Sequence, residues 1–329
     1  MTISPPLSLR VPQKKALLIA VRYGQLRDWN LELPATHRDP ITTRNLLQDV
    51  YGWKSEDITI LMDDGKHRDP TRDNIIQAMK ELVMDAQSGD HFVFMFSGHG
   101  GQVADLDNDE DDGFDEVIWP SDIQLDQIDL TYQKNCILDD EIKKILVASL
   151  PAESRLVMLF DCCHSGTIAD LAFRNGDECP QSPDTARPAG RLLGNRNGPP
   201  QNYTITTTVQ QDYTEEVDIM YSSMSNMENK SKTITVNKPV QPYVTSWSAC
   251  KDNQLTLESD DGCFIAAFAR ALRANPNQTH SEMLWSVTRE MELITQEANA
   301  TCGLGFTPAR PQLGSLQKVD EIYPHPLVL

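Results

Sequence analysis

The chain has 329 residues and 40% of them are hydrophobic, which is enough for one large α/β domain or two smaller ones. Its formal net charge of -19 argues against nucleic acid or an anionic membrane as a partner and favours metal ions or peptides bearing Lys or Arg. Seven irregularly spaced cysteines, no secretory apolar segment and no apolar run of about 18 residues predict a reduced protein of the cytoplasm or nucleus.

The first third of the sequence alternates between strand and helix patterns. Thr71 can cap the second helix, because its hydroxyl precedes an apolar stripe at helical spacing. Ser88-Gly89-Asp90 ends that helical region. Strand, helix, strand, helix and strand are predicted in turn: strands at 15–21, 57–62 and 91–96, a first helix at 41–50, and a second helix that Thr71 caps over Ile75, Ile76, Met79, Leu82 and Val83. This order predicts a parallel sheet with right-handed crossovers.

The rest of the chain is less regular. An acidic loop at 105–116 precedes a short strand at 116–119, a helix at 139–150 and a buried strand at 156–160. Residues 174–242 are rich in Pro, Gly, Asn, Gln, Ser and Thr, so we expect a mobile insert with an edge hairpin near 204–209. A strand at 243–249, helices at 263–272 and 281–297, and an irregular end containing Pro308 and Pro311 follow.

Two apolar strands run directly into turns that carry chemistry. Residues 91–96 lead to Ser97-Gly98-His99-Gly100-Gly101, and residues 156–160 lead to Asp161-Cys162-Cys163-His164-Ser165-Gly166. If these strands are parallel neighbours, their carboxyl ends bring His99 to Cys163. A thiol beside an imidazole is an activated nucleophile, with backbone N–H groups such as those of Cys163 and Gly100 as oxyanion donors.

Other interpretations of this turn stay open on the residues alone. Cys162 competes with Cys163, although neighbouring strand residues alternate faces and only one can point out of the turn. His164 is a poorer base because adjacent side chains diverge on an extended backbone. A zinc site from Cys162, Cys163, His164 and His99 is weaker, since structural zinc ligands are usually spaced by two to four residues.

The acidic run from Asp105 to Glu116 is either a solvated loop or part of a cation site. It is not an EF-hand, because the glycine required at position 6 is Glu110 and no helices flank the loop. A looser calcium site that takes carboxylates from other segments remains possible on this pattern.

Five motifs in this order resemble those of a type I metacaspase. They are Ser-Gly-His-Gly-Gly-Gln at 97–102, Asp-Glu-Asp-Asp-Gly-Phe-Asp-Glu at 109–116, Leu-Asp-Asp-Glu at 138–141, Asp-Cys-Cys-His-Ser-Gly at 161–166 and Trp-Ser-Ala-Cys-Lys-Asp-Asn-Gln at 247–254. The resemblance runs from about residue 15 to 316. It implies a caspase-like α/β fold, in which helices flank both faces of a central, mostly parallel sheet. It also implies a single domain over residues 15–329, preceded by a short extension at residues 1–14. The Pro/Gln-rich prodomain of many members is absent from this sequence.

The resemblance also implies a calcium-dependent cysteine endopeptidase that cleaves proteins or peptides after Arg or Lys, acts as a monomer and takes part in programmed cell death. His99 and Cys163 match the catalytic dyad of the family. Ser97, Asp161 and Asp252 match its acidic substrate pocket, and a basic side chain does need such a counter-charge. The calcium ligands of the family match Asp115, Asp139, Asp140 and Asp170.

The sequence departs from the family pattern at several places. Where the family has a Gly-Cys-x-Asn-Asp run, this sequence has Leu33-Pro34-Ala35-Thr36-His37-Arg38-Asp39. Thr36 takes the place of the cysteine of that run, which lines the substrate pocket in the family. The segment Leu255-Thr256-Leu257-Glu258 replaces the usual Thr-Ser-Ala-Asp, and the insert at 174–242 has no alignment.

Four hypotheses follow for function. The leading one is calcium-activated hydrolysis after Arg or Lys by Cys163 and His99. Self-processing is an extension of it, at the basic residues of the insert: Arg187, Arg191, Arg196, Lys230 and Lys232. The rivals are a non-proteolytic scaffold or quality-control factor with the same fold, and a caspase that cuts after Asp, which acidic pocket residues would disfavour.

Overall fold

The computed structural model describes residues 10–104, 113–125, 133–162, 168–175, 241–249, 264–302, 305 and 307–329. The chain divides into two units, residues 1–185 with 240–329 and residues 186–239, and the second lies wholly outside the described residues. The elements below all belong to the first unit. None of its described helices is both long and apolar enough to cross a bilayer.

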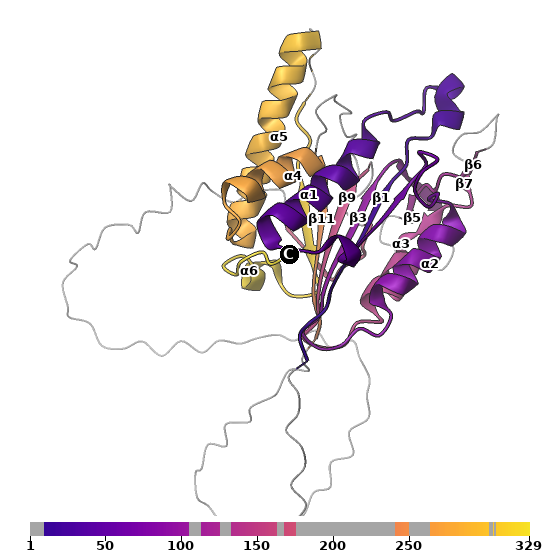
Figure 1. Cartoon of the computed structure of the whole chain (residues 1–329). Coiled ribbons are helices and arrows are strands. Elements are labelled where there is room, and N and C mark those ends of the chain that lie inside the picture. Colours follow the sequence, from indigo (N-terminus) through magenta and orange to yellow (C-terminus); the bar gives the residue numbers. More distant parts are fainter. Residues whose placement is uncertain are drawn as a thin grey trace, which may run out of the picture. The chain divides into compact units, whose positions relative to one another are not determined.

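Strands and helices alternate from β1 to β3, and the later strands come in consecutive groups (Figure 1). The strands are β1 (Lys14–Ala20), β2 (Ile58–Met62), β3 (His91–Ser97), β4 (Gly100–Ala104), β5 (Phe114–Ile118), β6 (Gln124–Leu125), β7 (Gln133–Lys134), β8 (Ile137–Leu138), β9 (Arg155–Asp161), β10 (Phe173–Arg174), β11 (Tyr243–Ser248) and β12 (Gln312–Ser315). The helices are α1 (Asp39–Tyr51), α2 (Arg72–Val83), α3 (Asp139–Ile142), α4 (Phe264–Ala274), α5 (His280–Cys302) and α6 (Val319–Ile322), with 3-10 turns η1 (Gly24–Trp29), η2 (Thr36–Arg38) and η3 (Ser55–Asp57) and the π-helical turn η4 (Lys143–Val147).

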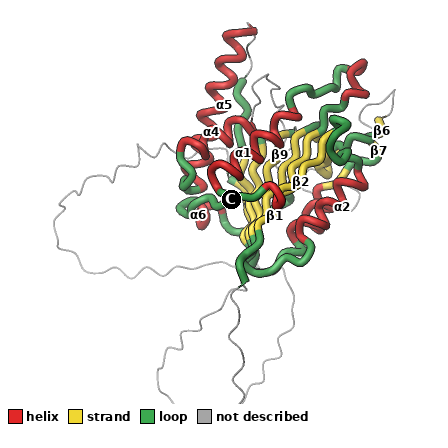
Figure 2. The backbone as a smooth tube through the Cα atoms, in the orientation of Figure 1, coloured by secondary structure: helices red, strands yellow, loops and turns green. Residues whose placement is uncertain are grey.

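A seven-stranded sheet forms the centre, in the order β10-β12-β11-β9-β3-β1-β2. Neighbouring strands from β11 to β2 are parallel, whereas β12 runs antiparallel to β11 and β10 antiparallel to β12. The predicted parallel pairing of the strands before His99 and Cys163 is therefore confirmed, because β3 and β9 are neighbours in register. Figure 2 shows the strands as one layer between helices.

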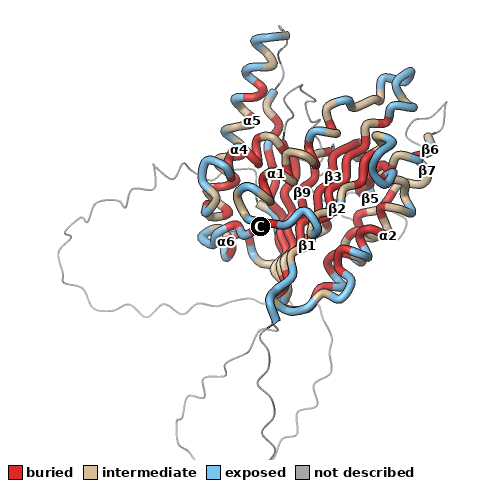
Figure 3. Tube along the Cα trace, in the orientation of Figure 1, coloured by how far each residue is buried: buried red, intermediate tan, exposed pale blue. Residues whose placement is uncertain are grey.

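Alternating residues of the strands feed two apolar layers, one on each face of the sheet. Residues such as Leu18, Met95 and Leu159 pack against α1, α4 and α5. The intervening residues, among them Phe94 and Phe160, pack against α2, α3 and η4. Figure 3 shows that the strands are buried along most of their length. Helices on both faces of the sheet, as the resemblance implies, are confirmed.

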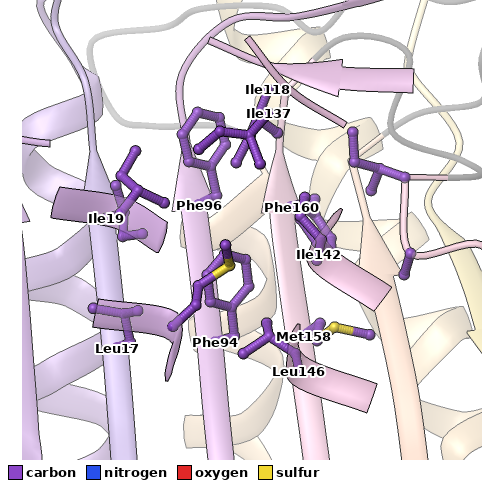
Figure 4. Close-up of a cluster of buried hydrophobic side chains, with 14 of the residues drawn as sticks. Leu17, Ile19, Phe94, Phe96, Ile118, Ile137, Ile142, Leu146, Met158 and Phe160 are labelled. Atoms are coloured by element: carbon purple, nitrogen blue, oxygen red, sulfur yellow. The ribbon is translucent and has the colours of Figure 1, made fainter. Parts of the chain in front are cut away.

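The layer beneath α2 and α3 is rich in large side chains (Figure 4). Phe94 and Phe160 are fully buried, with ring centroids 5.6 Å apart. Each such ring contributes about 1.5–3 kcal/mol through the apolar surface that it removes from water. This layer holds the ends of β3 and β9 in place immediately before the two polar turns.

Three sequence expectations were wrong. The chain end expected to be irregular contains β12 and α6, because β12 gains its hydrogen bonds by pairing with β11. The segment after His99 is a strand, β4, which pairs antiparallel with β5, and the strand expected at 116–119 begins earlier, so Asp115 lies in β5 rather than in a loop. The helix predicted at 139–150 is α-helical only to Ile142 and continues as the π-helical turn η4.

Candidate active site

The two polar turns leave the same edge of the sheet. Ser97, the last residue of β3, pairs in register with Asp161, the last residue of β9, and the Gly98 N–H donates to the Asp161 carbonyl at 3.2 Å. His99 and Cys163 each follow this pair by two residues. Cys163 itself lies outside the described residues, so the sheet places the starts of both turns together and the thiol position is not described.

The imidazole of His99 is held by backbone and aromatic contacts. Its Nε2 lies 2.9 Å from the carbonyl oxygen of Leu31. Its ring centroid lies 4.8 Å from that of Tyr23 and 5.1 Å from that of Trp119. Because a carbonyl oxygen can only accept, Nε2 carries the proton in the neutral ring and Nδ1 is left as the basic nitrogen. The geometry therefore gives His99 the tautomer of a general base acting through Nδ1.

Burial lowers the pKa of His99, and the hydrogen bond to Leu31, which favours the charged ring, only partly offsets this. Desolvation penalises the charged form of a base. A neutral imidazole at physiological pH is the form that can take a proton from a thiol or an attacking water.

Tyr23 is the residue that fixes the start of this turn. It is fully buried, its hydroxyl donates to the Trp119 carbonyl at 2.6 Å, and it accepts the His99 backbone N–H at 2.9 Å. Its backbone is left-handed, with φ 58°, which costs a non-glycine residue roughly 1–2 kcal/mol. The carboxylate of Asp63 stabilises that conformation by accepting the N–H groups of Arg22 and Tyr23 at 2.8 and 3.0 Å.

Asp63 is in turn held by His37, whose Nε2 lies 2.7 Å from its Oδ1. Burial alone would raise the pKa of Asp63. The hydrogen bonds from His37 and from the two backbone N–H groups outweigh burial and leave the pKa below its usual value. A contiguous set of contacts thus runs from His37 through Asp63 and Tyr23 to His99.

Cys162 is a core residue in this structure. It is 2% exposed and packs within the layer beneath α2 and α3. A thiol buried in this layer is a poorer candidate for the nucleophile than one in the turn. The same burial weakens the zinc interpretation, and two of the four proposed zinc ligands, Cys163 and His164, lie outside the described residues.

Two of the residues expected to line the substrate pocket, Ser97 and Asp161, lie on the other face of the same edge. The Ser97 hydroxyl is buried and donates to Oδ2 of Asp39, the first residue of α1, at 2.5 Å. Asp161 pairs with Ser97 across the sheet, and its Oδ2 accepts the Ile265 N–H at 3.1 Å at the start of α4. Two carboxylates therefore flank one hydroxyl. Asp252, the other expected pocket residue, lies outside the described residues.

Burial raises the pKa of Asp161 to about 6, against the opposing effect of the N–H groups of Ile265 and Phe264 that its carboxylate accepts. A carboxylate whose charged form is destabilised by burial gains from a cation placed beside it. This electrostatic state suits a site that receives a basic side chain.

Thr36 replaces the cysteine of the family motif without leaving a polar group unsatisfied. Its buried hydroxyl lies 3.0 Å from the Val21 carbonyl oxygen and 2.9 Å from that of Leu33, and it donates its proton to these acceptors. The substitution thus ties the segment before α1 to the end of β1.

The four expected calcium ligands come from neighbouring elements but do not converge. Asp115 of β5 and Asp139 of α3 are buried, and these two elements are in contact. Asp140 donates its N–H to Asp139 Oδ1 at 2.9 Å, and Asp170 forms an ion pair with Lys143. Within the described residues, no group of three His, Cys, Asp or Glu side chains is placed to hold a metal ion. The donors suit calcium chemically, but their arrangement is not a formed site.

Comparison with known proteins identifies the family. Residues 14–172 match the metacaspase peptidase C14 domain. Metacaspase-1 of Pyricularia oryzae is 36% identical over 88% of this chain and 72% of its own length. The chain belongs to the metacaspase family. Metacaspase-1 of Cryptococcus neoformans is 34% identical over 94% of this chain and 63% of its own length, which supports the type I class.

Solved structures agree on the fold. A protein of Geobacter sulfurreducens aligns with a TM-score of 0.54 at 20% identity, covering 97% of this metacaspase and 99% of that chain. Caspase-1 of Spodoptera frugiperda aligns with a TM-score of 0.50 at 10% identity, covering 96% and 89% of the two chains. The caspase-like fold expected from the motifs is confirmed, and as a metacaspase the protein is a cysteine peptidase.

Sequence reasoning missed two residues of this candidate site. Asp39 ends the Thr36-His37-Arg38-Asp39 segment, in the place of the final Asp of the family motif, so a signal for it existed. Tyr23 gave no comparable signal, because its role depends on a left-handed backbone and on a partner 76 residues away.

Proposed function

We propose that this metacaspase hydrolyses peptide bonds after Arg or Lys with a Cys163–His99 dyad. The observation that carries the proposal is the grouping of Ser97 with the carboxylates of Asp39 and Asp161 at the edge from which both turns leave, with Ser97 and Asp39 buried and Asp161 half-buried. A guanidinium or ammonium group entering there would meet two carboxylates, whereas the carboxylate of an Asp substrate would be repelled.

In the proposed mechanism, Nδ1 of His99 accepts the thiol proton and the Cys163 thiolate attacks the substrate carbonyl carbon. The imidazolium formed keeps its Nε2–H on the Leu31 carbonyl, which stabilises the charge. His99 then gives its proton to the leaving amine, and an acyl-enzyme remains. A water molecule, deprotonated by the same Nδ1, hydrolyses the thioester and restores the thiol.

Paired reporter peptides ending in Arg, Lys or Asp test the specificity. We expect turnover of the Arg and Lys peptides, none of the Asp peptide, and none by Cys163→Ala. Faster cleavage after Asp would indicate caspase specificity, and an intact Cys163 enzyme that cleaves no peptide under any condition would favour the scaffold function.

Calcium activation is the finer part of the proposal. Asp115, Asp139, Asp140 and Asp170 offer hard oxygen donors, and Lys143 would have to release Asp170 before that carboxylate could bind an ion. Calorimetric titration of Cys163→Ala protein with calcium measures binding apart from activity. We expect the Asp170→Asn variant to bind calcium at least tenfold more weakly than the parent. Asp73→Asn, in the first turn of α2, is the control and should bind calcium as the parent does. Equal calcium affinity in the two variants would contradict the proposed ligands.

Self-processing is a further part of the proposal. The candidate sites Arg187, Arg191, Arg196, Lys230 and Lys232 lie outside the described residues. Fragment masses after calcium addition, compared between the parent and Cys163→Ala, test it, and a chain that stays intact in both would exclude it.

A further inference from the structure

A row of basic side chains lies at the opposite end of the sheet from His99. Lys14 of β1 pairs in register with His91 of β3, His91 pairs with Arg155 of β9, and Arg155 pairs with Tyr243 of β11. Adjacent strands are spaced about 4.8 Å apart. The register therefore places an ammonium, an imidazole and a guanidinium on consecutive strands, where the parallel strands begin.

These side chains share one face of the sheet. The Lys14 ammonium lies 5.5 Å from the Trp53 ring centroid and donates to the Tyr51 carbonyl at 3.3 Å, both at the end of α1. The Arg155 guanidinium lies 5.3 Å from the Tyr243 ring centroid. Lys15, the next residue after Lys14, points to the other face and donates to the Met84 carbonyl at 3.0 Å.

The row has donor capacity that the described part of the chain does not use. His91 Nδ1 is buried, and no described residue forms a hydrogen bond with it. Among the residues that the structure describes, no carboxylate forms an ion pair with Arg155, and its side-chain contact is the face of Tyr243. Lys14 uses one of its three donor protons on Tyr51. Burying a charge or a hydrogen-bond donor without an acceptor costs folding free energy. An anion bound between these side chains would accept their hydrogen bonds and offset that cost.

The pKa of His91 reflects its two cationic neighbours. Burial lowers the pKa of His91 most, and the positive charges of Arg155 and Lys14 lower it further, against an opposing effect of Asp90. That carboxylate is already engaged, since it accepts from Arg10 at 2.7 Å and from the Gln13 N–H at 2.7 Å. In a chain of net charge -19, this end of the sheet thus carries the positive charges of Lys14 and Arg155, with which no carboxylate of the described residues forms an ion pair.

We propose that Lys14, His91 and Arg155 form a binding site for the oxyanion group, phosphate or carboxylate, of a small molecule. The planar guanidinium of Arg155, oriented by Tyr243, supplies two parallel donors, which matches the geometry of either group. Nδ1–H of His91 supplies a third donor from the neighbouring strand, and Lys14 supplies a point charge beyond it. The site is separate from peptide hydrolysis, because it lies where β3 and β9 begin and His99 follows the end of β3.

The full-length Cys163→Ala protein provides the test, because it cannot cleave itself during the titration. Sodium phosphate and sodium succinate are added separately at constant ionic strength, with chloride as the balancing salt. Thermal unfolding and the imidazole signals of His91 in a nitrogen-15 NMR spectrum are followed. We expect a saturable response to at least one probe, and the probe that binds more tightly identifies the group.

Arg155→Gln should weaken binding at least tenfold, and Lys15→Gln should leave it unchanged because that side chain lies on the other face. If Arg155→Gln does not fold, as judged by circular dichroism, Lys14→Gln replaces it under the same criterion. A response to both probes no larger than that to chloride would overturn the proposal, as would saturable binding that the substitution in the row leaves intact.

Discussion

The phenolic oxygen of Tyr23 lies 2.9 Å from the backbone nitrogen of His99 and 2.6 Å from the carbonyl oxygen of Trp119. One hydroxyl therefore ties the turn that carries the proposed base to the segment that follows β5. Its own position is fixed by Asp63, which holds the left-handed backbone of Tyr23. The position of the imidazole thus depends on a residue that is not itself a reacting group.

Tyr23→Phe should lower kcat for an Arg reporter peptide about tenfold and change KM less than twofold. Loss of the hydroxyl removes the acceptor of the His99 N–H, at a cost of about 1–3 kcal/mol for the buried donor left behind, and loosens the turn. Steady-state kinetics measure the effect. Tyr51→Phe is the matched control, because that hydroxyl also donates to a carbonyl, that of Pro276, but contacts neither catalytic turn. An unchanged kcat in Tyr23→Phe would contradict the positioning role.

Gly98→Ala should reduce kcat at least as much as Tyr23→Phe does. A Cβ at Gly98 would lie 2.8 Å from the Tyr23 hydroxyl oxygen and 2.9 Å from the Phe96 ring, and both groups are fully buried. Overpacking of this kind costs about 1–3 kcal/mol of folding free energy. Urea unfolding and kinetics on the same preparation check both effects. Gly24→Ala, whose Cβ would meet nothing within 4 Å, should change neither.

The pH dependence of kcat/KM for an Arg peptide should show an acid limb near the Asp161 pKa of about 6. Below that pH the carboxylate is protonated and attracts the guanidinium less, so kcat/KM falls. The pKa of His99 is lowered by burial, so its basic form persists below the ordinary range of a histidine, and substitution of Asp161 tells the two groups apart. Asp161→Asn should abolish the limb and raise KM for the Arg peptide. A limb at the same pH in this variant would assign it to another group.

His280 should make the protein less stable in mild acid. It is buried at the start of α5, its Nδ1 donates to the His325 carbonyl at 2.7 Å, and burial lowers its pKa to about 4. The unfolded chain binds a proton below pH ~6.5, whereas the folded chain does so only below about 4, so stability falls as the pH drops between these values. At pH ~5 the expected loss is about 2 kcal/mol relative to pH ~7.5.

Urea unfolding at both pH values measures this loss. His280→Gln, which does not titrate, should lose about 2 kcal/mol less than the parent over the same interval. His67→Gln is the control, because that imidazole lies at the surface beside Asp64 and its removal should not reduce the difference. Equal losses in the parent and His280→Gln would show that His280 does not titrate as its burial predicts.

The central sheet and its catalytic edge could be predicted from the sequence because the signals are local. The apolar runs of β3 and β9 end in polar turns, and their parallel pairing follows from the alternation of strands and helices. The hairpin of β4 and β5 was not predictable in the same way, since Gly100 and Gly101 have low strand propensity and pair only because β5 lies opposite. For the same reason β12, with Gln312 and Gly314 among four residues, exists through pairing with β11.

Some residues of the candidate site could likewise be predicted from the sequence, and others could not. His99, Ser97 and Asp161 are close to one another in the sheet register, so motif and topology were sufficient to group them. The Leu31 carbonyl and the Tyr23 hydroxyl reach His99 over 68 and 76 residues of chain, and no periodic pattern encodes such contacts. The ion pair of Lys143 with Asp170 was also not expected, because a motif of acidic residues does not indicate which basic side chain will lie beside it.

The strand order also determines what would happen to a nicked protein. A cut anywhere between residues 175 and 241 would separate β9 and β10, on the amino-terminal piece, from β11 and β12, on the carboxyl-terminal piece. In the sheet these strands interleave, since β12 and β11 lie between β10 and β9. Main-chain hydrogen bonds would then join the two pieces on both sides of the β12–β11 pair, so a severed chain would remain one particle and part only when the sheet itself is unfolded.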